Sequence, residues 1–112
     1  MSAVMPRPLA DDSSTELRSI DELDAAICSL AKQMNIDCYR MLVLVREFDD
    51  RFGWMKWWFK SCPEWLAWRC SLKPSTAREK VRTAHALRKL PAISKAFAEG
   101  RLSYSKVRAL TR

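Results

Sequence analysis

Glycine, histidine and long apolar runs are all scarce in this chain, and each shortage excludes a class of structure. The 112 residues include two glycines and five prolines, which argues against a sheet-rich fold with many tight turns and favours helices with short breaks. No run approaches the roughly 18 apolar residues that a membrane span needs, and the acidic N-terminus lacks the apolar segment of a secretory signal. We therefore expect a cytoplasmic, all-α protein of one ordinary domain at most.

Metal ligands and catalytic constellations are also scarce. The chain has one histidine, His85, and four cysteines without a CxxC pair. A structural zinc site needs about four closely spaced thiolate or imidazole ligands, so neither a metal nor a cofactor is expected. Cys38 falls on an apolar helical face and Cys70 at a core position, which predicts free, buried thiols. No nucleophile–base pair, carboxylate dyad or phosphate loop is visible, so we do not expect this chain to be an enzyme by itself.

Charge is present but unevenly distributed. Up to Arg51 there are six Lys/Arg against ten Asp/Glu, whereas the rest of the chain has fourteen against three. A strongly basic second half favours a polyanion such as DNA as the partner of that half alone. The alternative is that these charges only keep the protein soluble.

The first half predicts a disordered leader over residues 1–19 and one long amphipathic helix over residues 20–52. Apolar residues recur there at alternating steps of four and three, which forms one continuous stripe. The stripe consists of Leu23, Ile27, Leu30, Met34, Cys38, Met41, Val45 and Phe48. A helix of this length is about 45 Å long, more than a small domain needs to cover its core. Part of the stripe could therefore meet a second chain or a missing part of the protein; alternatively, it packs wholly on its own bundle.

Residues 52–60, FGWMKWWFK, are difficult to assign to a structure. Trp54, Trp57 and Trp58 fit one helical face, but short aromatic runs also suit strands. We expect the tryptophans to fill the junction between the long helix and the helices after residue 60. The interleaved Lys56 and Lys60 leave stacking on unpaired bases as an alternative.

Residues 65–90 predict two helices joined by a tight turn, a pattern similar to a helix-turn-helix. Ser61 and Glu64 form an S-x-x-E capping box in front of the first helix. The second helix is expected from Pro74 to Lys89, with Ser75 slightly preferred over Lys73 as its N-cap. Its apolar face comprises Ala77, Val81, Ala84 and Leu87. An ordinary helical hairpin with a solvated polar face is the alternative.

The opposite face of this second helix is basic, as a helix lying in a DNA groove requires. Lysine and arginine neutralise phosphates, and an arginine near the helix N-terminus can bond to a guanine edge. The predicted nucleic-acid-binding residues are Lys73, Ser75, Thr76, Arg78, Arg82, His85 and Lys89.

Two further helices complete a compact bundle over residues 53–112. One is expected from Pro91 to a C-terminal Gly100, and the other follows the capping residue Ser103. The last helix has no stop signal before Arg112, so we expect the chain to be the front part of a longer protein.

Several motifs in order resemble the N-terminal region of the bacterial domain of unknown function 222 family. They are WLAWRC at 65–70, TARE at 76–79, VR at 81–82 and GRLSYSKVRALT at 100–111. The resemblance covers about residues 23–112. It implies a helical part that precedes a His-Asn-His (HNH) nuclease module. No nuclease residue carries over, because an HNH site needs clustered histidines and a divalent metal.

These observations support three hypotheses of function. The first is a non-catalytic, DNA-binding N-terminal module of an HNH-endonuclease-associated protein. The second is a helical protein-interaction or dimerisation module, in which the long stripe pairs two chains or docks a C-terminal nuclease module. The third is a free-standing helix-turn-helix transcriptional regulator.

Overall fold

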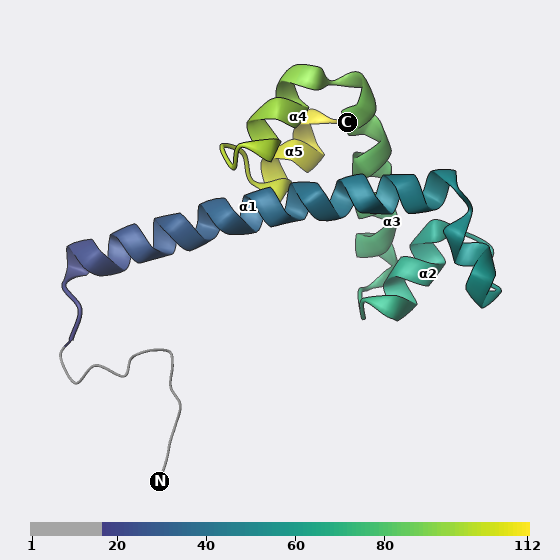
Figure 1. The fold of residues 1–112 in the computed structure, drawn as a ribbon, viewed down its shortest axis with the longest axis horizontal. Helices are drawn as coiled ribbons and strands as arrows, with labels where there is room; N and C mark the ends of the chain where they lie inside the picture. Colours follow the sequence, from purple (N-terminus) through teal and green to yellow (C-terminus); the bar gives the residue numbers. More distant parts are fainter. Residues whose placement is uncertain (1–16) are drawn as a thin grey trace, which may run out of the picture. The chain divides into compact units, whose positions relative to one another are not determined.

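The computed structural model describes residues 17–112, and within them the fold is all-α with no strand (Figure 1). The chain divides into two compact units, Met1–Leu30 and Ala31–Arg112. The first helix, α1, spans Ile20–Asp50 and contributes to both units. The predicted fold class is therefore confirmed. Most of the predicted leader, residues 1–16, lies outside the described residues.

The first unit contains the start of α1, where Ser19 forms a complete capping box. The Ser19 hydroxyl accepts a hydrogen bond from the Glu22 N–H at 3.0 Å, and the Glu22 carboxylate accepts one from the Ser19 N–H at 2.8 Å. These bonds satisfy backbone donors that no helical carbonyl can reach. The box has the same S-x-x-E spacing that predicted the cap at Ser61, so this helix start was also readable from the sequence.

The second unit is organised around α3, Pro74–Ala86, which crosses the C-terminal part of α1 (Figure 1). One core cluster joins Ala77 and Val81 to Val45 of α1 and to Leu66 of α2, Cys62–Arg69. A second cluster lies further along α3. Its buried members are Leu42, Ala84, Leu87, Phe97 and Val107. The four predicted apolar positions are thus all buried, and they connect two separate parts of the core. The predicted helix end at Lys89 is wrong, because α3 ends at Ala86 and Leu87 lies in the 3-10 turn that follows it.

The remaining helices begin and end at residues with a clear local cause. A short 3-10 helix, η2, Leu87–Lys89, follows α3, and α4, Pro91–Ala98, begins at a proline. Gly100 has a φ of 79°, which suits a glycine after a helix end. The Ser103 hydroxyl accepts a hydrogen bond from the Lys106 N–H at 3.2 Å and caps α5, Tyr104–Leu110. The predicted helix starts at Pro91 and Ser103, and the predicted glycine after a helix end at Gly100, are therefore confirmed.

The aromatic segment after α1 forms a 3-10 helix, η1, Gly53–Trp57. Its flanking residues, Phe52 and Trp58, have φ values of 55° and 66°, so the backbone turns sharply at both ends. Trp54 and Trp65 pack against the first core cluster, whereas the Trp58 side chain is 93% exposed. The junction prediction is therefore right for Trp54 and wrong for Trp58, because the turn at Trp58 breaks the helical spacing that had placed it on the same face.

Two details of the predicted helix pair are also wrong. Cys70 is exposed, because α2 ends at Arg69 and the chain turns before Cys70 can face the core. The N-cap of α3 is Lys73 and not Ser75. Pro74 explains this shift, since its fixed φ and missing N–H suit the first helical position.

The apolar stripe of α1 differs between the two units. In the first unit Ile27 and Leu30 are each 65% exposed, and Leu23 is partly exposed. In the second unit Met34 is exposed, whereas Met41 and Phe48 pack against the buried Val45. The stripe from Met41 to Phe48 therefore belongs to the protein's own core.

Candidate nucleic-acid interface

The predicted binding residues lie on the polar face of α3, at its N-cap Lys73 and in the following η2, and the structure divides them into two groups. Lys73, Ser75, Arg78 and Lys89 are exposed, and Thr76 is half-buried. Among the described residues, no carboxylate lies within 4 Å of the charged groups of Lys73, Arg78 or Lys89, since none of them forms a salt bridge. Their charges are available to an external anion.

Arg82 belongs to the second group, because its guanidinium is bonded within the protein. Its Nη2 lies 3.1 Å from Glu79 Oε1. It also donates to the main-chain carbonyls of Thr111 and Arg108, each at 3.2 Å. These bonds tie α3 to the C-terminal end of the chain, so Arg82 acts as a connection between elements.

His85 is likewise engaged inside the protein. Its Nε2 lies 2.7 Å from Asp49 Oδ2 near the end of α1. Two neighbouring contacts reinforce this junction: Arg46 donates to the Ala84 carbonyl at 3.1 Å, and Arg88 pairs with Asp50. The acidic end of α1 therefore engages His85, one of the residues that the sequence had assigned to DNA.

Glu79 is the centre of an arginine cluster that sequence reasoning missed. Its Oε1 accepts from Arg82, from Arg108 Nε at 2.9 Å and from Arg112 Nη2 at 2.6 Å. These arginines, the hydrogen bond from Arg82 first, lower the pKa of Glu79 to about 2. The i, i+3 spacing of Glu79 and Arg82 was the only local signal. Only the tertiary fold brings Arg108 and Arg112 into contact with Glu79.

The three carboxylates of the basic second half are all occupied by intramolecular contacts. Glu64 accepts from the Lys60 N–H at 3.4 Å at the start of α2, and Glu99 pairs with Arg101 at 2.7 Å. Glu79 forms ion pairs with Arg82, Arg108 and Arg112. Many exposed cations consequently form no salt bridge within the described residues. They are Lys56, Lys60, Arg69, Lys73, Arg78, Lys89, Lys95 and Lys106.

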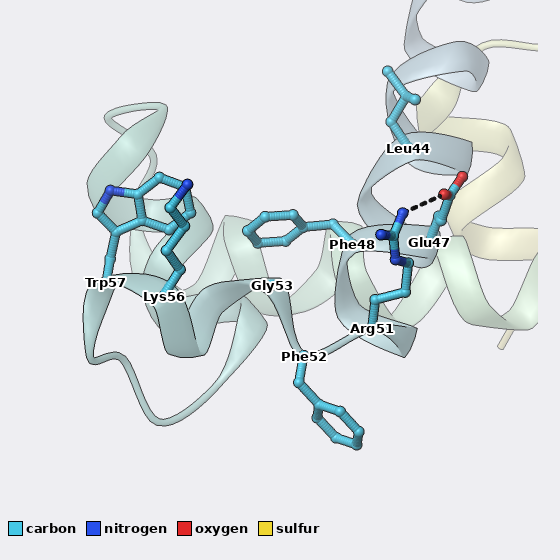
Figure 2. Close-up of a pocket in the computed structure, with 8 residues that line it drawn as sticks. All are labelled: Leu44, Glu47, Phe48, Arg51, Phe52, Gly53, Lys56 and Trp57. Atoms are coloured by element: carbon cyan, nitrogen blue, oxygen red, sulfur yellow. Dashed lines mark hydrogen bonds and ion pairs between the residues drawn. The ribbon is translucent and has the colours of Figure 1, made fainter.

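A cavity of about 550 Å³ lies at the corner between α1 and η1 (Figure 2). The Phe48 ring points into it, Lys56 lies beside Trp57, and Phe52 points away from the other side chains. Arg51 and Glu47 pair at 3.1 Å on its rim. Leu44 and Gly53 complete the lining. Aromatic packing dominates this corner, since Phe48 also stacks on Trp65 with ring centroids 4.1 Å apart.

Within residues 17–112, no group of three or more histidine, cysteine or carboxylate side chains is placed to hold a metal ion. Burial, followed by the nearby Asp49, raises the pKa of the Cys62 thiol to about 12, so this thiol stays protonated and unreactive at neutral pH. In the same described part of the chain, no helix is both long and apolar enough to cross a membrane.

Comparison with known proteins identifies the family but no close relative. A family model described as "Domain of unknown function (DUF222)" matches residues 21–112, and the chain therefore belongs to this family. No curated protein and no solved structure matches the chain.

Proposed function

We propose that this DUF222 chain is a non-catalytic module that binds duplex DNA through the basic surface of its second half. The observation that supports the proposal is the charge arrangement: the three carboxylates of residues 52–112 are engaged internally, while Lys73, Arg78 and Lys89 are exposed and form no salt bridge among the described residues. Exposed lysine and arginine side chains bind phosphates and release condensed counterions, which gives affinity for DNA of any sequence.

In this proposal α2 and α3 act as a helix-turn-helix pair, with α3 in the major groove. The connection between them is short, residues 70–73, as in known helix-turn-helix units. Ser75 and Arg78 lie in the N-terminal turns of α3, where reading helices contact base edges. If an HNH nuclease module accompanies this chain, as the family resemblance implies, this part would hold the nuclease on DNA.

Fluorescence anisotropy with a labelled duplex at several salt concentrations tests the proposal. We expect affinity to fall steeply with salt, and the double variant Lys73→Gln/Arg78→Gln to weaken binding. For this variant, the slope of the logarithm of the binding constant against the logarithm of the salt concentration should be shallower by about 0.9 for each lost phosphate contact. Arg40→Gln/Arg51→Gln is the matched control, because it removes the same charge from salt-bridged positions on or just after α1. Absence of binding at low salt, or equal losses in both variants, contradicts the proposal.

A second candidate function is self-association through the start of α1. The supporting observation is the exposure of its apolar face, with Ile27 and Leu30 each 65% exposed. Ile20 and Ile27 alternate with Leu23 and Leu30 at steps of three and four. β-Branched residues alternating with leucine in this way favour parallel two-stranded coiled coils. Analytical ultracentrifugation over a range of protein concentrations measures this association directly.

A further inference from the structure

A second cavity lies between α2 and α3, next to the exposed Arg78. Its volume is about 610 Å³, which is within the range of natural small-molecule sites. The side chains that matter to its chemistry are Phe59, Ser61, Glu64, Trp68 and Arg78. The cavity thus combines two aromatic rings, a hydroxyl, a carboxylate and a guanidinium.

The aromatic side of the cavity remains open to solvent. Trp68 is 55% exposed although it lies within α2. Its ring packs on Phe59 with centroids 5.3 Å apart, and the Arg69 guanidinium lies 5.6 Å from the Trp68 ring centroid. A large exposed tryptophan supported by a second ring provides a stacking surface for a flat ligand.

The charge around this cavity favours an anionic ligand. Between Phe52 and Arg78 the chain has five Lys/Arg and one acidic residue, Glu64. One oxygen of the Glu64 carboxylate accepts a hydrogen bond from the Lys60 main-chain N–H. Neither Lys60 nor Arg78 forms a salt bridge within the described part of the chain. A neutral or basic peptide would gain nothing from these cations, whereas a phosphate backbone would.

We propose that this cavity holds one unpaired nucleobase, so that the module binds DNA most tightly where a base is extrahelical. The base would stack on Trp68, and Arg78 and Lys60 would contact the flanking phosphates. The Glu64 carboxylate can accept a hydrogen bond from an exocyclic amine, as on cytosine. Stacking suits any base, because every base has a π-face. The inference rests on the proposed DNA binding and adds the form of DNA that is preferred.

The test compares two labelled duplexes of equal length, one fully paired and one with a single extrahelical cytosine, by fluorescence anisotropy. We expect the wild-type protein to bind the second about tenfold more tightly, since stacking one base on an aromatic side chain strengthens binding by at least about this factor. Trp68→Leu should abolish this preference and leave the affinity for paired DNA within about twofold.

Two further variants make the result specific to the cavity. Ala67 lines the cavity, so Ala67→Leu should fill it and abolish the preference without removing the Trp68–Phe59 contact. Trp58 is exposed but does not line the cavity, so Trp58→Leu is the matched tryptophan control and should keep the preference. Circular dichroism confirms that each variant is folded.

Each other outcome has a defined meaning. Salt-dependent binding of both duplexes with equal affinity overturns the inference and leaves the proposed function intact. Binding of only the duplex with the extrahelical cytosine supports the inference and contradicts the proposed binding of fully paired DNA. Equal losses in Trp68→Leu and Trp58→Leu overturn the cavity as the site. Absence of any DNA binding overturns both proposals.

Discussion

Arg82 shows how tertiary contacts change the role that a helical pattern predicts for a residue. On a helical projection Arg82 lies on the same face as Arg78. In the fold it reaches Glu79 and the carbonyls of Arg108 and Thr111. Moving this guanidinium to a phosphate would break several hydrogen bonds and lower the stability of the fold. Arg78 is therefore the better target for testing DNA binding, and Arg82 the better target for testing stability.

Glu79→Gln tests the arginine cluster. The arginines lower the pKa of Glu79 to about 2 from its ordinary value of 4.5. A lowered pKa in the folded protein contributes stability that is full above about pH 4.5 and is lost as the pH falls toward 2. We expect the variant to melt at a lower temperature than the wild type at neutral pH, and the difference to shrink below pH 4.5. Thermal melts followed by circular dichroism at pH 7 and pH 3 measure it.

Glu47→Gln is the control for this prediction. Glu47 pairs with Arg51 at 3.1 Å on an exposed helical surface, where such pairs contribute little. It should change the melting temperature less than Glu79→Gln at pH 7. If the Glu79→Gln difference is the same at pH 3 as at pH 7, the ionised carboxylate does not stabilise the cluster.

Among the elements, the corner between α1 and η1 depends on a single glycine, Gly53. A Cβ atom on Gly53 would lie 2.5 Å from the Phe48 ring. That ring is held between Trp65 and Trp57, with centroids 4.1 Å and 6.3 Å away. The ring cannot move without disturbing the packing of η1 against the first core cluster.

Gly53→Ala should therefore destabilise the protein by about 1–3 kcal/mol, the usual effect of overpacking. Thermal denaturation should show a fall in Tm of about 4–8 °C per kcal/mol for a domain of this size. Ser105→Ala is the control, because Ser105 is exposed on α5. An unchanged Tm for Gly53→Ala would mean that the corner relaxes freely and that its packing does not contribute to stability.

At the scale of the whole molecule, charge and apolar surface are separated along the chain. The segment Ile20–Leu30 has three acidic residues, no basic residue and an exposed apolar face. Residues 52–112 carry the excess of cations. DNA binding and self-association would thus use different parts of the chain, so one can be removed without the other.

A variant in the first unit tests this independence. Ile27→Asp/Leu30→Asp places charges in the exposed apolar face. Ultracentrifugation should show less association than the wild type, because each charge would be buried at a pairing position. DNA affinity per chain should change little. Asp21→Ala serves as a surface control with unchanged association. A wild-type protein that stays monomeric at the highest soluble concentration removes the self-association hypothesis.

Sequence periodicity was sufficient for the helices and for the inner face of α3. Ala77, Val81, Ala84 and Leu87 are buried as the spacing predicts, because a helix presents one face every 3.6 residues whatever it packs against. The capping residues Ser61 and Ser103 were also readable, since caps act over three or four residues. Trp58 was not, because its left-handed φ depends on how η1 packs.

The tertiary structure alone decided which charges are free. Asp49 engages His85, and Arg108 and Arg112 converge with Arg82 on Glu79. Asp49 lies 36 residues from His85, and Glu79 lies 29 and 33 residues from Arg108 and Arg112, so no local pattern predicts these three contacts. Only the Glu79–Arg82 pair has a local i, i+3 spacing. Sequence therefore determined that the second half is basic and helical. The fold determined that Arg82 and His85 bond within the protein, whereas Arg78 and Lys89 form no salt bridge among the described residues, because ion pairing depends on distance in space.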